Sequence, residues 1–159
     1  MNAYQIDLLK HYGLEIEMNQ LELSLKKIDF IDQGIMVNHP GHNQVDISSG
    51  IMTYMQKNKM RVQAWGSLAQ GIYSRDESPY DTPEIIKTRA YVKQLADEKN
   101  VTTEAIALAW LMKHPIGIEP IIGSKTPGRI LNCRNAQLVE LSRLEWYTLL
   151  TYSRGNMIP

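Results

Sequence analysis

Apolar and polar side chains alternate along residues 14–25, which predicts extended structure at period two. Two shorter segments, 62–65 and 118–123, are also predicted as strands because apolar residues run into turn-forming ones. The stretches between these strands are longer than hairpin turns and carry helical periodicity. The pattern therefore predicts parallel βα units.

Capping signals mark where the helices begin. Asn2 followed by Gln5, and Ser142 followed by Glu145, have the spacing of a capping box. A threonine marks three further starts, two of them followed by proline: Thr82, Thr102 and Thr126. A fourth pattern, at 46–58, has its apolar residues on one helical face. Gly13 and Asn100 end the first helix and the one that begins after Thr82.

The predicted fold class is α/β, a partial or half TIM barrel of βα units with about three to four parallel strands, in a single domain over 1–159. A parallel sheet normally has both faces covered and its edges protected, so three strands leave it incomplete. A closed barrel needs about 250 residues. We therefore expect a portion of something larger, with inward-facing apolar layers and one or two sheet edges exposed.

Composition narrows the function classes. Seventeen basic and 17 acidic residues cancel in a chain of 159, which gives no general attraction to nucleic acid or to an anionic membrane. One cysteine, Cys133, excludes an intrachain disulfide. The opening sequence lacks the pattern of a signal peptide, and no apolar run approaches the ~18 residues of a spanning helix. These features predict a soluble, cytoplasmic protein.

The segment "IIGSKTPGRI", residues 121–130, carries the strongest chemical signal. A helix start is already partly positive and normally attracts acids, yet residues 123–130 contain none and add Lys125 and Arg129. Gly123 lets a ligand approach the backbone, while Ser124 and Thr126 supply hydroxyls. A bound phosphate would explain this arrangement. The alternative is a surface helix with two solvated basic residues and ordinary Ser/Thr capping.

Four segments, in order, resemble the C-terminal half of the aldo-keto reductases, an NADP-dependent (β/α)₈-barrel family. "NAYQIDLLKHYG" resembles the helix after the fifth strand, and "NQLELSL" resembles the sixth strand. "VQAWGSLAQG" resembles the seventh strand with its loop. "EPIIGSKTPGRILNC" resembles the eighth strand and the segment that binds the adenosine phosphate. The resemblance covers essentially the whole chain.

The resemblance implies NADP (NADPH) as cofactor and gives each matching residue a role. Gln20 would hydrogen-bond the nicotinamide carboxamide, and Trp65 would stack on its ring. The loop along the pyrophosphate would comprise Gly66, Ser67, Leu68, Gln70 and Gly71. The residues around the 2′-phosphate and adenine would be Ser124, Lys125, Thr126, Arg129 and Asn132. Three positions depart from the family pattern: Gly66, Ala69 and Cys133. The methyl group of Ala69 could obstruct the phosphates.

Each of these residues also has a structural interpretation, as a satisfied polar side chain, a core aromatic or a turn residue. The family's catalytic Asp, Tyr, Lys and His belong to the first half of its barrel, so no catalytic residue is assigned. His39 and His42 form an H-x-x-H pair in an apparent loop without further ligands, and no metal site is predicted.

The leading functional hypothesis is the cofactor-binding portion of an NADP-dependent carbonyl or alcohol oxidoreductase, inactive alone. Its expected partners are the dinucleotide and either an N-terminal half-barrel or a second copy that covers the open sheet. The alternative is a non-catalytic NADP-binding module or a structural, self-associating half-barrel remnant.

Overall fold

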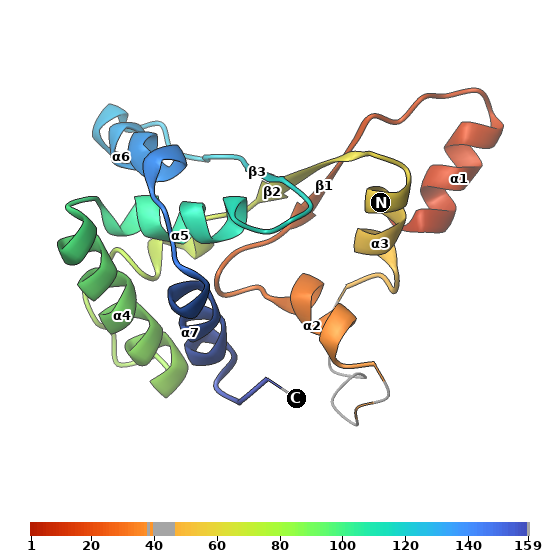
Figure 1. The fold of residues 1–159 in the computed structure, drawn as a ribbon. Helices are drawn as coiled ribbons and strands as arrows, with labels where there is room; N and C mark the ends of the chain where they lie inside the picture. The colour runs from red at the N-terminus through yellow and green to blue at the C-terminus, as the bar shows by residue number, and fades with distance from the viewer. Residues whose placement is uncertain (38, 40–46, 159) are drawn as a thin grey trace.

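A computed structural model describes residues 1–37, 39 and 47–158 (Figure 1). Its elements in chain order are α1 (Ala3–His11), β1 (Met18–Glu22), α2 (Asp29–Ile35), α3 (Ile51–Lys57), β2 (Arg61–Trp65), the 3₁₀ turn η2 (Ala69–Gly71), α4 (Pro83–Lys99), α5 (Thr103–Met112), β3 (Ile118–Pro120), α6 (Pro127–Cys133), the 3₁₀ turn η3 (Arg134–Leu138) and α7 (Arg143–Arg154).

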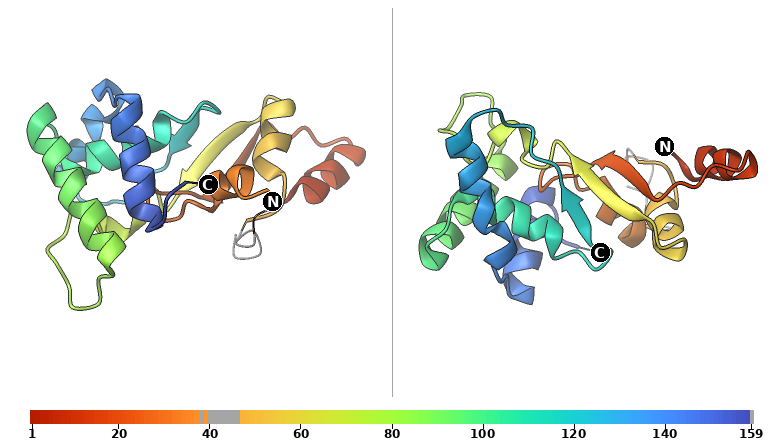
Figure 2. Two further views of the ribbon diagram at one scale, coloured as in Figure 1. Left: turned by 60° about the horizontal axis from the view of Figure 1, so that its bottom comes forward. Right: turned by 90° about the horizontal axis from the view of Figure 1, so that it is seen from above.

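The three strands form an open parallel sheet in the order β1-β2-β3, and Figure 2 shows them side by side. Gln20 pairs with Gln63, and Gln63 pairs with Glu119 on the other side. Parallel strands separated by helices are what the sequence predicts, so the α/β class and the open, incomplete sheet are confirmed. The described part of the chain does not close into a barrel.

One face of the sheet is covered by the hydrophobic core. Val62 and Ala64 of β2 are fully buried against residues of α3, α4, α5 and α7. Beyond its polar first turn, helix α5 is apolar on every side and its residues 105–111 are all buried, because it packs against both β3 and α4. The indoles of Trp110 and Trp146 stack 5.1 Å apart, and each donates its N–H to the other residue's carbonyl, at 3.1 and 2.9 Å. The Trp110–Trp146 contact therefore holds α7 against α5.

The capping signals act as predicted at both capping boxes. Asn2 accepts from the Gln5 amide, and Ser142 accepts from the Glu145 amide, with the reciprocal bonds also present. Asn100 ends α4 in a left-handed conformation. The helix predicted over 46–58 is shorter, at Ile51–Lys57, because Gly50 adopts φ 71° immediately before it.

Helix α2 was not predicted. Ile28 occupies its N-cap and offers no side-chain hydrogen bond, so the usual start signal is missing. The helix forms because Phe30 and Ile31 reach the core, and its carboxylate Asp32 bonds Nε of Arg154 at 2.9 Å. Tertiary contacts, and not a local signal, specify this element.

The uncovered face of the sheet differs from the expected apolar layer. It carries Gln20 and Glu22 from β1, Gln63 from β2 and Glu119 from β3, and the amide of Gln20 donates to Gln63 at 3.3 Å. The guanidinium of Arg61 forms two 2.7 Å bonds to Glu119. This face is therefore mostly polar, and the expectation of exposed apolar layers is wrong.

Candidate functional site

A cavity of about 510 Å³ lies beyond the carboxyl ends of β2 and β3. Its lining combines the loop after β2 with the segment after β3: Gly66, Ser67, Leu68, Gln70, Gly71, Ser74, Arg75, Glu104, Ile121, Gly123, Ser124, Arg129 and Asn132. Parallel α/β proteins bind ligands at this end of the strands, because the loops there converge. Nine of the thirteen residues predicted to bind the phosphate or the cofactor are among these lining residues.

The first wall of the cavity is the loop 66–71. Gly66 adopts φ +61°, a left-handed conformation that glycine reaches at no steric cost. Ala69 and Gln70 also have positive φ, at 48° and 56°, and their Cβ atoms make this conformation sterically unfavourable. Ser67 is buried, and its hydroxyl donates to the carbonyl of Ile121 at 2.9 Å. This bond ties the two walls together. Ala69 packs against the core and is absent from the lining, so its methyl group leaves the cavity open.

The second wall is the segment 123–132. Thr126 occupies the N-cap of α6, but its side chain makes no capping hydrogen bond, so the first amides of α6 are not capped by it. Ser124 accepts from the Thr126 amide at 3.2 Å. Arg129 reaches the cavity, and its guanidinium has no hydrogen-bond or ion-pair partner among the described residues. Lys125 and Thr126 lie outside the lining, so the basic character of this wall comes from Arg129.

Gln20 and Trp65 lie outside this cavity, on the uncovered face of the sheet. Trp65 follows Gln63 by two residues and pairs with Glu22, so it shares a face with Gln20. Trp65 is 47% exposed, whereas Trp110 is fully buried in the core. An exposed indole at the carboxyl end of a parallel strand is available to stack on a planar ligand.

Four lining residues were not predicted: Ser74, Arg75, Glu104 and Ile121. Arg75 belongs to the connection to α4, and Glu104 to the first turn of α5. Their positions come from the tertiary fold, and neither residue lies in the loop after β2 or the segment after β3.

Arg75 is held at the cavity by Asp81. The Asp81 side chain is only 1% exposed, and it accepts from Arg75 at 3.2 Å and from the backbone amide of Ser78 at 2.8 Å. Arg89 on α4 donates to it at 2.7 Å. The hydrogen bond from Arg75 is the main cause that holds the pKa of Asp81 well below its usual range. The carboxylate therefore anchors the connection between β2 and α4.

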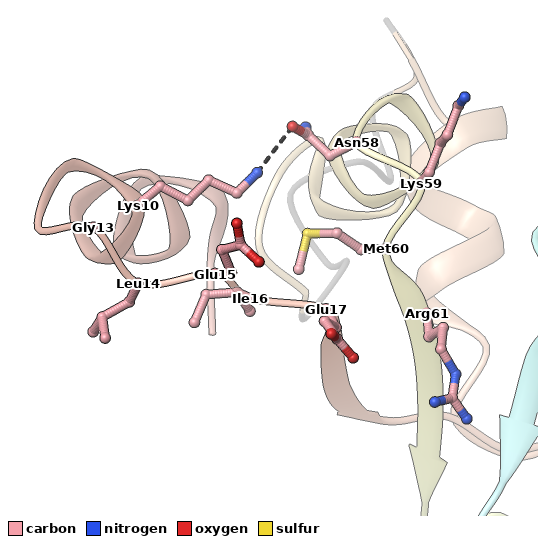
Figure 3. Close-up of a pocket in the computed structure, with 10 residues that line it drawn as sticks. All are labelled: Lys10, Gly13, Leu14, Glu15, Ile16, Glu17, Asn58, Lys59, Met60 and Arg61. Carbon is pink, nitrogen blue, oxygen red and sulfur yellow. Dashed lines mark hydrogen bonds between the residues drawn. The ribbon is translucent and has the colours of Figure 1, made fainter.

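A larger cavity, of about 690 Å³, lies at the opposite end of the strands (Figure 3). Lys10 there donates to the side chain of Asn58 at 3.0 Å. Two acids, Glu15 and Glu17, line this cavity together with the basic residues Lys59 and Arg61, so its charges are mixed. It adjoins the amino ends of β1 and β2, where parallel α/β folds do not place active sites, and none of the predicted cofactor residues line it.

No group of three or more metal-ligating side chains occurs in the described ranges. Of the H-x-x-H pair, His42 lies outside the described residues. Cys133 is buried on α6, where its thiol contacts the Arg129 carbonyl at 3.2 Å, and burial raises its pKa. None of the helices described is long and apolar enough to cross a membrane.

The sequence profile of the aldo/keto reductase family matches residues 5–149. The chain is 28% identical to a 6-dehydroglucose reductase of Agrobacterium fabrum over 139 residues, covering 79% of this chain and 43% of that protein. It is also 28% identical to a 6-dehydroglucose reductase of Novosphingobium aromaticivorans over 156 residues, covering 98% and 45%. The chain thus spans less than half the length of these curated relatives.

Solved structures show the same fold. A thermostable aldo-keto reductase crystallised with the inhibitor epalrestat superposes with a TM-score of 0.64 at 18% identity, over 92% of this chain and 43% of the other.

Proposed function

Because the chain belongs to the aldo/keto reductase family, we propose that it is the cofactor-binding portion of an NADP-dependent carbonyl or alcohol oxidoreductase. The observation that carries this proposal is the cavity beyond β2 and β3, where an unpaired guanidinium, Arg129, lies beside Ser124 and the loop 66–71. Such a combination suits a phosphorylated ligand, because a free guanidinium can bind phosphate through two parallel hydrogen bonds.

In this proposal the adenosine 2′-phosphate lies at Arg129 and Ser124, with Lys125 and Thr126 at its outer side. The diphosphate runs along the loop 66–71, and the nicotinamide reaches the exposed indole of Trp65 beside Gln20. The cofactor supplies hydride transfer when bound. The chain's own residues bind it, orient it and keep its ring at the carboxyl end of the sheet.

We assign catalysis to residues outside this chain. The uncovered sheet face is mostly polar, and the outer edges of β1 and β3 are unpaired in the described structure, which suits an N-terminal half-barrel as partner. Polar groups that become buried need hydrogen-bond partners, which the strands of an N-terminal half-barrel would supply. A second copy of the chain is the alternative occupant, and sedimentation at several protein concentrations separates the two.

The test is turnover, measured as NADPH oxidation with simple aldehydes. The chain alone is expected to give none. Turnover should appear when the amino-terminal half of an aldo-keto reductase relative is added, and Trp65→Ala in this chain should then weaken NADPH binding. Reduction by the chain alone at ordinary enzyme rates, about 1 to 10³ per second, contradicts the assignment. NADP binding without turnover in every combination favours the non-catalytic module instead.

A further inference from the structure

Helix α1 is apolar on two opposite sides, and only one of them is covered. Ile6 is fully buried in the core, whereas Tyr4, Leu8 and Tyr12 are between 55% and 87% exposed. These three residues are four positions apart, so they lie along one side of the helix and form the α1 stripe. Contiguous exposed apolar side chains of this kind mark a contact surface for another element.

A second apolar surface lies beside the free edge of β3. It is a groove of about 450 Å³ between α5, β3 and α6, named here the β3 groove. Its larger apolar lining residues are Leu108, Met112, Pro120, Ile122, Ile130 and Leu131. Ile130 and Leu131 on α6 are 45% and 62% exposed, so the groove is also uncovered.

The two surfaces lie at opposite ends of the sheet. Figures 1 and 2 show α1 at one end of the molecule and α6 at the other. The side-chain amide of Asn19 on β1 donates to the carbonyl of Met1, just before α1, at 2.9 Å, so α1 is held near β1. The outer edges of β1 and β3 are both unpaired in the described structure. The α1 stripe therefore cannot reach the β3 groove of its own chain.

A second copy can fill both surfaces at once. A twofold axis along the strands places β1 of each copy beside β3 of the other and keeps all strands parallel. The α1 stripe, a row of side chains that projects from a helix, then meets the β3 groove of the other copy, which is a hollow. A head-to-tail contact of this kind closes into a ring when its rotation completes a circle. Edge strands readily pair with another chain, so the same arrangement also gives the free edges a partner.

The area agrees with a stable pair. A tyrosine side chain buries about 150–250 Å², so the two tyrosines and the leucine of one α1 stripe remove about 400 Å² from water. Two stripes and the two grooves that they fill therefore bury about 1,600 Å², the usual size of a specific interface. One contact alone buries half of that area, which is typical of weak contacts, so a stable pair needs both.

We propose that two copies of this chain close into a ring, with the α1 stripe of each copy in the β3 groove of the other. This inference goes beyond the proposed function, because the pair forms without an amino-terminal half-barrel. The stripe and the groove share no lining residue with the cavity assigned to the dinucleotide. An amino-terminal half-barrel competes for the same two surfaces and should split the pair when it is added.

Sedimentation of the full chain at several concentrations tests this proposal. The wild-type chain should sediment at twice its mass of 18.2 kDa at about 50 μM, because interfaces of this size reach micromolar dissociation constants or tighter. Leu8→Asp and Leu131→Asp should each weaken association by at least about tenfold, because a carboxylate loses its hydration in an apolar contact. Leu144→Asp, at an exposed leucine of α7 outside both surfaces, is the matched control and should associate like wild type.

A mixture of the two variants tests the reciprocal arrangement. A Leu8→Asp chain paired with a Leu131→Asp chain has both substitutions in one contact and leaves the other contact wild type. Each variant paired with itself has a substitution in both contacts. Because a second substitution costs little once a contact is lost, the mixture should associate about tenfold more tightly than either variant alone.

A wild-type chain that stays monomeric up to about 100 μM overturns this inference, and that measurement needs no variant to fold. It leaves the proposed function intact, with the amino-terminal half-barrel as the occupant of both surfaces. Open-ended polymers in place of a closed pair also overturn the inference. So does a pair that neither aspartate weakens, or a mixture that associates no more tightly than its components.

Discussion

Thr88 on α4 carries a hydroxyl whose removal should stabilise the protein. The residue is fully buried, and its Oγ1 has no hydrogen-bond partner in the described structure. An unsatisfied buried hydroxyl costs about 1–3 kcal/mol. Valine has nearly the same shape and a similar helix propensity, so Thr88→Val should remove this cost without leaving a cavity.

The expected gain is about 1–2 kcal/mol in the free energy of unfolding, which for a chain of this size raises Tm by about 2–8 °C. Urea denaturation measures the first quantity and calorimetry the second. Thr88→Ser is the matched control: it keeps the hydroxyl, deletes a buried methyl group and should destabilise by about 1 kcal/mol. A Thr88→Val protein less stable than wild type would refute the reasoning, because it would mean that the hydroxyl has a partner worth more than its burial costs.

Three further predictions concern strain and titration. Gln70 has a left-handed backbone at φ 56°, so Gln70→Gly should raise the free energy of unfolding, measured by urea denaturation, by up to about 1 kcal/mol. A lower free energy of unfolding would mean that the contacts of the Gln70 side chain stabilise the protein by more than the backbone strain costs. Burial raises the pKa of Tyr73 to about 12, so the free energy of unfolding should fall as pH rises from about 10 through that value. Tyr73→Phe should remove the part of this fall that Tyr73 causes, as measured by thermal melts at alkaline pH. Burial lowers the pKa of His114, so the stability that its neutral form contributes is present above about pH 6.5 and lost as pH falls. The free energy of unfolding of His114→Gln should therefore change less than that of wild type between about pH 7 and 5.

The elements with local signals could be predicted from the sequence. Asn2, Asn100 and Ser142 act through contacts with residues a few positions away, so their effect is readable in a short window. Helix α2 lacks such a contact at Ile28 and depends on distant core residues, which a local pattern does not contain. The polar character of the open sheet face also needed the strand register, because residue types alternate but do not say which face is covered.

The candidate site likewise contains residues that local sequence predicts and residues that only the tertiary fold places there. The residues at Gly66–Gly71 and Gly123–Asn132 follow two strands, so their convergence could be anticipated from a parallel sheet. Glu104 and Arg75 could not, because each reaches the cavity through the packing of another element against those loops. Lys125 was predicted beside Arg129, but it precedes α6 and lies outside the lining of the cavity.

The proposed cofactor preference is tested most directly by the affinity of the Arg129→Gln chain for NADP⁺ and NAD⁺. Arg129 has no competing partner among the described residues, so its contact with a 2′-phosphate would be lost entirely. Arg134→Gln, at an exposed position just after α6 and outside the cavity, is the control and should bind like wild type. Arg129→Gln should weaken NADP⁺ binding by about tenfold to a hundredfold while NAD⁺ changes by about threefold or less. Equal weakening of both nucleotides, or none, would contradict the placement of the 2′-phosphate at Arg129.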